Sequence, residues 1–156
     1  MIYNRDKSVE YAHEWAHSRN PKYYNFDKLG GDCTNFISQC LYAGCGAMNY
    51  TRDTGWYYNS LSDRAAAWSG VEFLHRFLTS NKGRGPYASE LPLQFAQPGD
   101  IIQLSFNGEK FGHSLLVVAL QPKILIAAHT DDCDNRPLDT YYFKLARLLH
   151  IEGVRG

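Results

Sequence analysis

The fold is decided by the stretch Gly30-Gly31-Asp32-Cys33-Thr34-Asn35-Phe36-Ile37-Ser38-Gln39-Cys40-Leu41. Two glycines interrupt the preceding structure. Apolar side chains then follow at positions 36, 37, 40 and 41, which is the spacing of one helix face counted from Cys33. Gly44 and Gly46 provide the expected end of this helix. Cys33 is therefore expected in the first helical turn, on the face that turns toward the core.

A cysteine in the first turn of a helix lies near unpaired backbone N–H groups and near the positive end of the helix dipole. Both favour the thiolate, which is the nucleophilic form of the side chain. Cys33 is therefore the leading candidate for a catalytic nucleophile. The alternative is that it is a small buried hydrophobe, which is our interpretation of Cys40 and Cys45. A histidine within reach of Cys33 would favour catalysis.

The length and composition of the chain limit the classes of protein to consider. A chain of 156 residues is expected to form one domain, 1–156, with a proper core. Sixteen basic and sixteen acidic residues give a formal net charge of zero, so nothing indicates a nucleic-acid partner or an anionic membrane surface. The longest apolar run, 115–120, is too short to span a membrane.

The beginning of the chain and its cysteines bear on the compartment. The first six residues lack the apolar stretch of a secretory signal, so the protein is expected to work in the cytoplasm, leave the cell by another route, or be cut from a longer precursor. Four cysteines at irregular spacing do not predict a disulfide framework or a zinc finger.

Hydrophobic periodicity predicts helices in the first half of the chain and an antiparallel meander in the second. Helices are expected over 8–16, from Cys33 to a stop at Gly44 and Gly46, and over 69–81. Strands are expected over 101–106, 113–120, 124–129, 141–143 and 145–151. Asn107-Gly108 is a strong signal for a hairpin turn. Residues 49–68 are rich in aromatic side chains without a predicted element, and 84–97 are expected to form a loop. Helices followed by an antiparallel meander indicate an α+β domain.

Two histidines are expected at one rim of this sheet. His113 opens the central strand, and His129 ends the antiparallel strand that returns beside it. If the cysteine helix packs across the sheet, His113 can reach Cys33 and exchange protons with it. His129 could orient His113, with Asp131 as the competitor, because a slip of one residue in the register reverses which side chain faces the helix. A surface role for His113 and a structural role for His129 remain the alternatives.

A metal site is the other interpretation of these residue types. His113, His129, Asp131 and Cys133 can all ligate metals. They lack the compact ligand pair of zinc hydrolases and the glycine and closing glutamate of a calcium loop. We therefore expect no metal and no cofactor.

The cysteine stretch resembles the signature of the bacterial putative amidase domain family, which is similar to the CHAP and NlpC-type cell-wall hydrolases. The resemblance extends over nearly the whole chain. It includes, in family order, Tyr3-Asn4-Arg5, Tyr11-Ala12, Asn20-Pro21, Gly55-Trp56-Tyr57, Trp68-Ser69, Pro98-Gly99-Asp100-Ile101-Ile102, His113-Ser114 and His129-Thr130. The cysteine motif is specific, whereas the isolated tryptophans and Gly-Asp are weak signals alone.

The resemblance implies a papain-like domain with helices packed on an antiparallel sheet. It implies Cys33 as nucleophile, His113 as base and a polar third residue, best matched by His129. We expect Asp32, Trp56 and Trp68 to bind substrate, the substrate to be peptidoglycan or a related peptide, and the protein to be a monomer. Such relatives are often secreted, so the missing signal is a departure from the family. The alternative is a non-catalytic module that holds a peptide or glycan with the aromatic loop around Trp56.

Overall fold

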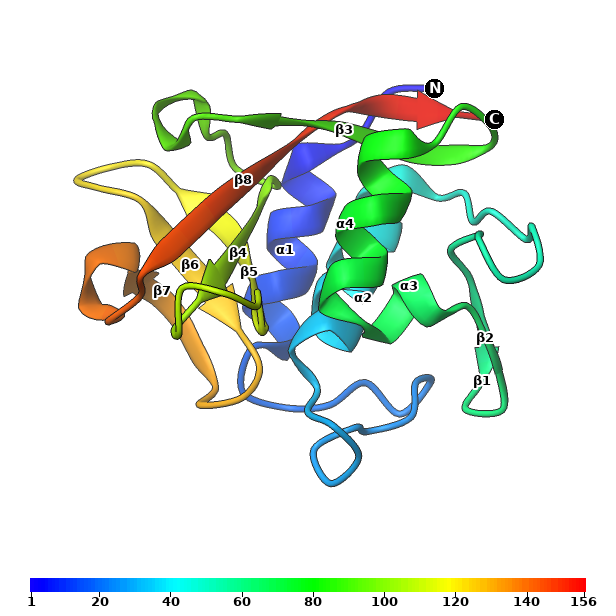
Figure 1. Ribbon diagram of the computed structural model, residues 1–156, viewed down its shortest axis with the longest axis horizontal. Helices are drawn as coiled ribbons and strands as arrows, with labels where there is room; N and C mark the ends of the chain where they lie inside the picture. Colours follow the sequence, from blue (N-terminus) through cyan, green and yellow to red (C-terminus); the bar gives the residue numbers. More distant parts are fainter.

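A six-stranded antiparallel sheet forms one layer of the protein, and the computed structural model describes all residues, 1–156. The strand order is β3-β8-β4-β5-β6-β7 (Figure 1). The strands are β3 (Gly85–Leu91), β4 (Ile101–Ser105), β5 (His113–Ala119), β6 (Leu125–Ala128), β7 (Cys133–Pro137) and β8 (Leu145–Arg155). A separate two-stranded ribbon consists of β1 (Tyr58–Ser60) and β2 (Asp63–Arg64).

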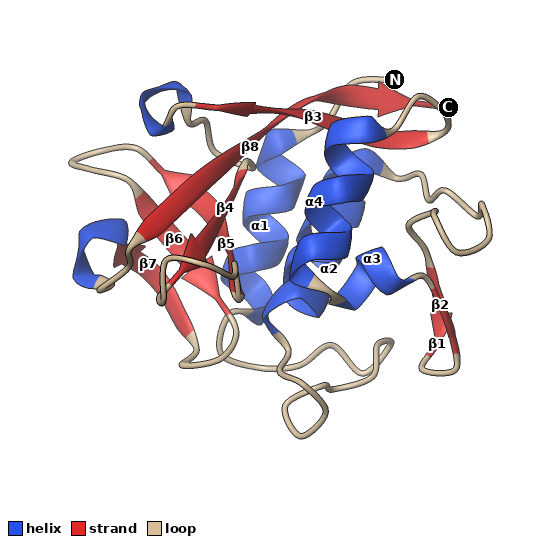
Figure 2. Cartoon of the chain, viewed as in Figure 1, coloured by secondary structure: helices blue, strands red, loops and turns tan.

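The longer helices gather on one side of this sheet (Figure 2). They are α1 (Arg5–Trp15), α2 (Cys33–Cys45), α3 (Ala66–Ser69) and α4 (Val71–Ser80), and the short 3₁₀ helices are η1 (Leu93–Phe95) and η2 (Leu138–Thr140). The predicted α+β class is therefore confirmed. None of these helices is long and apolar enough to cross a membrane.

Helix α2 occupies the centre of the molecule. Eleven of its thirteen residues are buried, and it packs on β5 and β6. Gly46 ends the helix with a φ of 65°, and its N–H donates to the Tyr42 carbonyl. A Cβ atom at Gly44 would lie 2.5 Å from the Tyr3 ring, so the close approach of the N-terminal segment requires a glycine there. The predicted helix and its end are confirmed.

The sheet is buried on both faces because alternate residues of its central strands point to opposite sides. Ile101 and Leu116 belong to the larger core between the sheet and the helices. Ile102 and Leu115 belong to a smaller core on the other face, which also contains Leu138 of η2. His113 and Ser114 begin β5, so they stand at the end of this double-sided core.

Several element boundaries differ from the sequence predictions. The first helix begins at Arg5, where Asn4 caps it by accepting from the Lys7 N–H. The region 84–97 is not a loop throughout, because β3 pairs there with β8. The polar segment after His129 forms β7, whereas 141–143 forms no strand. Both missed strands lie at the edges of the sheet.

Candidate active site

The start of α2 meets the start of β5. The Thr34 hydroxyl lies 3.0 Å from the Ser114 hydroxyl. The Ser114 backbone is also near enough to the Cys33 thiol to act on its pKa. Ser114 follows His113 directly, so the structure brings Cys33 and His113 to the same end of the sheet. The sulfur makes no hydrogen bond to the His113 ring in this conformation; its side-chain partner is the Thr34 hydroxyl at 3.8 Å.

Cys33 rests as a thiol. Burial raises its pKa, and the negative charge of Asp32 acts in the same direction. Hydrogen bonds from the Ser114 backbone and from Thr34 oppose this shift without reversing it. The expectation that the helix start favours the thiolate is therefore corrected by desolvation, because Cys33 is only 9% exposed.

His113 rests as a neutral imidazole. Its pKa is lowered to about 4, chiefly by burial and also by the Arg136 charge, while the Asp131 charge opposes the shift. The ring lies between two aromatic rings, with centroid distances of 6.2 Å to Phe106 and 5.9 Å to Tyr141. A neutral imidazole is the form that can accept a proton from a thiol. The resting pair is thus thiol and imidazole rather than an ion pair.

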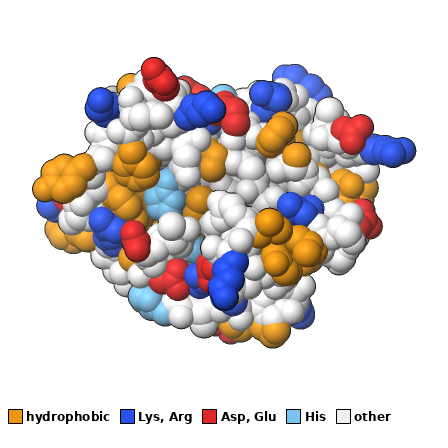
Figure 3. Space-filling view, turned by 60° about the horizontal axis from the view of Figure 1, so that its bottom comes forward, with side chains coloured by type: hydrophobic (Ala, Val, Ile, Leu, Met, Phe, Trp, Pro, Cys, Tyr) orange, Lys and Arg blue, Asp and Glu red, His pale blue; other side chains and the backbone are white.

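A hollow of about 380 Å³ opens in front of His113. This volume lies within the range of roughly 300–1,000 Å³ that is typical of small-molecule sites. Figure 3 shows the face of the molecule on which a histidine lies between hydrophobic side chains, with acidic and basic groups beside them. The residues that line the hollow are Phe106, Gly112, His113, Thr130, Asp131, Arg136, Tyr141 and Tyr142.

His129 does not orient His113, because both of its ring nitrogens have other partners. Nδ1 lies 2.5 Å from the Asp32 carboxylate, and Nε2 lies 2.8 Å from the Trp15 carbonyl. Both partners carry acceptor oxygens, so neither ring nitrogen is left to contact His113. It is 1% exposed and stacks on Phe36 with a centroid distance of 3.8 Å. These contacts are those of a structural histidine, and Asp131 and Arg136 are the charged groups that line the hollow with His113.

Asp32 is buried and its carboxylate binds other groups of the protein rather than a substrate. One carboxylate oxygen accepts from the Phe26 N–H at 2.8 Å and from the Asn35 amide at 2.9 Å. The other oxygen accepts from His129 and lies 3.5 Å from Arg19 Nε. The side chain is 1% exposed, so a substrate cannot reach it. Our assignment of Asp32 to substrate binding is corrected.

The two tryptophans assigned to substrate binding also lie in the core. Trp56 and Trp68 are fully buried, with ring centroids 4.9 Å apart. The Trp56 indole donates to the Ser38 hydroxyl at 3.0 Å, and the Trp68 indole donates to the Asn35 amide oxygen at 2.9 Å. Neither side chain lines a groove, so this expectation is corrected as well.

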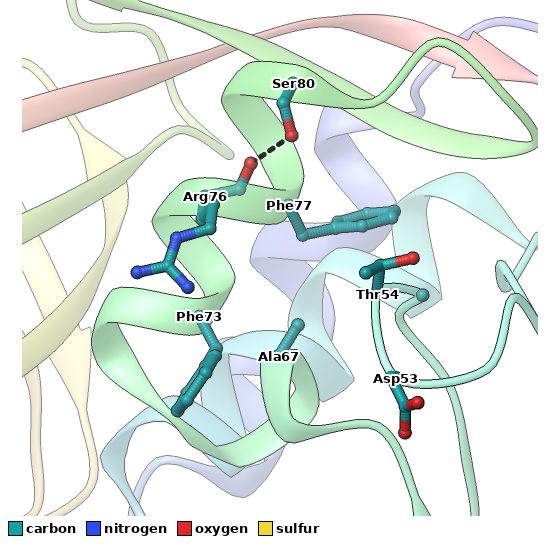
Figure 4. A pocket seen from close by; sticks show the side chains of 8 residues that line it. Asp53, Thr54, Ala67, Phe73, Arg76, Phe77 and Ser80 are labelled. Atoms are coloured by element: carbon teal, nitrogen blue, oxygen red, sulfur yellow. Dashed lines mark hydrogen bonds between the residues drawn. The ribbon is translucent and has the colours of Figure 1, made fainter.

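A second hollow, of about 170 Å³, lies beside α4 and is separate from the cysteine and histidine pair. Figure 4 shows Phe73, Phe77 and Arg76 of α4 along it, opposite the loop that carries Asp53 and Thr54. It contains no cysteine or histidine, so it offers neither a nucleophile nor a base of the kind found near His113.

The described residues contain no group of three or more ligating side chains placed to hold a metal ion. Sequence reasoning missed four side chains that line the hollow near His113, namely Phe106, Arg136, Tyr141 and Tyr142. Arg136 lies in a polar stretch, and nothing in its spacing indicates that it faces His113.

Residues 2–151 match the family described as "Putative amidase domain". The chain belongs to this family. It is also 34% identical over 137 residues to YhbB, an uncharacterized protein of Bacillus subtilis (strain 168). That match covers 86% of this chain and 43% of YhbB, so the chain spans less than half the length of this relative. No solved structure matches the chain significantly. Family membership indicates, at a coarse level, a hydrolase that acts on amide bonds.

Proposed function

We propose that the protein is a thiol-dependent amidohydrolase in which Cys33 attacks an amide carbonyl and His113 transfers the protons. The observation that carries this proposal is the 3.0 Å contact between the Thr34 and Ser114 hydroxyls, because Thr34 directly follows Cys33 and Ser114 directly follows His113. Acyl transfer needs a nucleophile, a base near it and space for the substrate. Here these are a buried thiol, a neutral imidazole at the same end of the sheet and an open hollow.

The reaction follows from the resting protonation states. His113 takes the proton of the Cys33 thiol as sulfur bonds to the carbonyl carbon. It then gives this proton to the nitrogen as the C–N bond breaks, and the amine leaves. Water next attacks the thioester and His113 accepts its proton, so that the carboxylic acid leaves and the thiol is restored. The Cys33 N–H has no partner within its helix at this first position and is placed to stabilise the oxyanion.

The scaffold supports a papain-like assignment of the NlpC and CHAP type. A helix that begins with the nucleophile packs on an antiparallel sheet, and the adjoining strand begins with the histidine. On this assignment the substrate is peptidoglycan or a related peptide, cleaved at a peptide bond or at the amide that joins peptide to glycan. The competing idea of a non-catalytic binding module relied on Trp56, whose indole is buried.

Purified peptidoglycan and mass spectrometry of the released fragments test this proposal. We expect the wild type to release peptide fragments and Cys33→Ala to release none. Cys133→Ala is the matched control, since Cys133 is a second free cysteine near the same end of the sheet, and it should remain active. An acid quench during turnover should leave an acyl group on the Cys33 peptide. Fragment release by Cys33→Ala would refute the nucleophile.

A further inference from the structure

We propose that Arg136 binds a carboxylate of the amide substrate, next to the bond that is cleaved. This inference rests on the proposed function and adds the chemical class of the substrate. Arg136 lines the same hollow as His113, and nothing in the sequence or in the family description assigns it a role.

The guanidinium of Arg136 is held in place before any ligand binds. Its Nε donates to the Thr140 hydroxyl at 2.8 Å, and Nη2 donates to the Thr140 carbonyl at 3.3 Å. The Thr140 hydroxyl in turn donates to the Pro137 carbonyl at 2.7 Å. The guanidinium carbon lies 3.6 Å from the centre of the Tyr141 ring, which supports its flat face. The third nitrogen, Nη1, has no hydrogen-bond partner within the chain, so its N–H groups are available to a ligand.

Arg136 has no carboxylate partner, although this protein pairs several other arginines with acids. Arg5 lies 2.8 Å from Asp100, Arg19 lies 2.9 Å from Asp132, and Arg147 lies 3.2 Å from Glu72. Asp131 lines the same hollow without forming an ion pair with Arg136. A planar guanidinium held by its neighbours and lacking an acid is suited to bind a carboxylate through two N–H groups.

The position of Arg136 places this carboxylate near the reacting atoms. Its charge is strong enough at His113 to lower the pKa of that ring. The hollow also borders the start of α2, because a Cβ atom at Gly31 would lie 3.6 Å from the Thr130 hydroxyl in its wall. Phe106 and the fully projecting Tyr142 add apolar surface around the entrance. The substrate therefore combines an amide, a nearby carboxylate and apolar groups.

The paired reagents iodoacetate and iodoacetamide test the charge preference without a substrate. Both alkylate a thiol through the same carbon, and only iodoacetate carries a carboxylate. Peptide mapping resolves Cys33 from Cys133, and the measured quantity is the ratio of the two rates at Cys33. We expect Arg136→Gln to lower the iodoacetate-to-iodoacetamide ratio roughly tenfold, since a bond to a charged group is lost. Asp131→Asn should raise the ratio.

The matched control is Arg155→Gln. Arg155 also lies over a tyrosine, with its guanidinium carbon 3.8 Å from the centre of the Tyr87 ring, but it is outside the hollow. This variant should leave the ratio unchanged. A ratio that does not respond to Arg136→Gln overturns the inference while leaving the proposed function intact. A Cys33 that does not react with iodoacetamide at all refutes the proposed function and this inference with it.

Protection experiments distinguish the two sources of such a carboxylate, a terminal α-carboxylate or an acidic side chain. The probes are N-acetylalanine, N-acetylglutamic acid α-amide and the neutral N-acetylalaninamide, at matched millimolar concentrations. We expect one of the acids to slow iodoacetamide labelling of Cys33 more than the neutral amide does, and Arg136→Gln to remove this difference. The acid that protects identifies the source. Equal protection by all three, or no protection by either acid, overturns the inference.

Discussion

Replacing Asp32 by asparagine should destabilise the protein and make Cys33 more reactive at the same time. The substitution keeps the shape of the side chain and removes its charge. In the native protein that charge faces the buried ring of His129 at 2.5 Å and Arg19 Nε at 3.5 Å. The Asp32 and His129 side chains are each 1% exposed, so water cannot replace the lost carboxylate as a partner.

The expected loss of stability is large. Removing one partner of a buried ion pair costs about 3–5 kcal/mol, because the remaining charge stays desolvated. The amide of asparagine can still accept from the Phe26 N–H or the Asn35 amide, which favours the lower end of this range. A domain of this size has roughly 5–15 kcal/mol of stability in total. The variant should therefore still fold, with a clearly reduced free energy of unfolding.

The same substitution should increase the reactivity of Cys33 although it lowers the stability of the protein. The Asp32 charge raises the pKa of the thiol, so its removal should lower that pKa and increase the thiolate fraction near neutral pH. Urea unfolding measures the first effect, and the iodoacetamide labelling rate of folded protein measures the second. Asp134→Asn is the control, because its partner His13 is 40% exposed and an exposed pair is worth only about 0–1 kcal/mol. A loss below about 1 kcal/mol for Asp32→Asn, or slower labelling of Cys33, would refute this reasoning.

Three further predictions concern the same site and the core. Labelling of Cys33 by iodoacetamide should keep rising with pH between about 7 and 9, because its pKa is raised above the ordinary value; a plateau across this range would indicate a resting ion pair instead. In steady-state kinetics, His113→Ala should abolish turnover and Asp131→Asn should lower kcat/KM. His129→Gln should chiefly lower the midpoint of urea unfolding. A large loss of kcat/KM in His129→Gln with little loss in Asp131→Asn would restore His129 as the orienting group. Trp56→Ala should cost about 3–5 kcal/mol in urea unfolding without a selective rise in KM, since its indole is in the core. A stable variant with raised KM would contradict that placement.

The parts of the fold that could be predicted are those with a strong local signal. Helix α2 combines a long apolar period with a glycine stop, and the hairpin of β4 and β5 has apolar strands around Asn107-Gly108. The edge strands β3 and β7 have no such signal. They contain glycine, proline and polar residues, and they are held by backbone pairing to one neighbour only. Pairing of this kind leaves little trace in the side-chain pattern.

Only those site residues that begin or end a strand could be placed from the sequence. His113 begins a strand, so its location at the rim followed from the sequence, and the structure brings it to the start of α2. The partners of His129 are separated from it by 97 residues for Asp32 and 114 residues for the Trp15 carbonyl. No spacing rule connects groups so far apart. The same applies to Trp56, whose burial depends on how α2 and α3 close over it.

The charge of Asp32 at the start of α2 stabilises the fold but disfavours the thiolate of Cys33. A carboxylate at the N-cap stabilises a helix because it faces the positive end of the dipole. Asp32 occupies this position and also holds His129 and Arg19, so the fold depends on its charge. The same charge raises the pKa of the adjacent thiol. In the proposed mechanism, Cys33 is therefore activated by proton transfer to His113 when an amide carbonyl is in place, and not by a preformed thiolate. Burial keeps the His113 ring neutral, which is the form that accepts a proton.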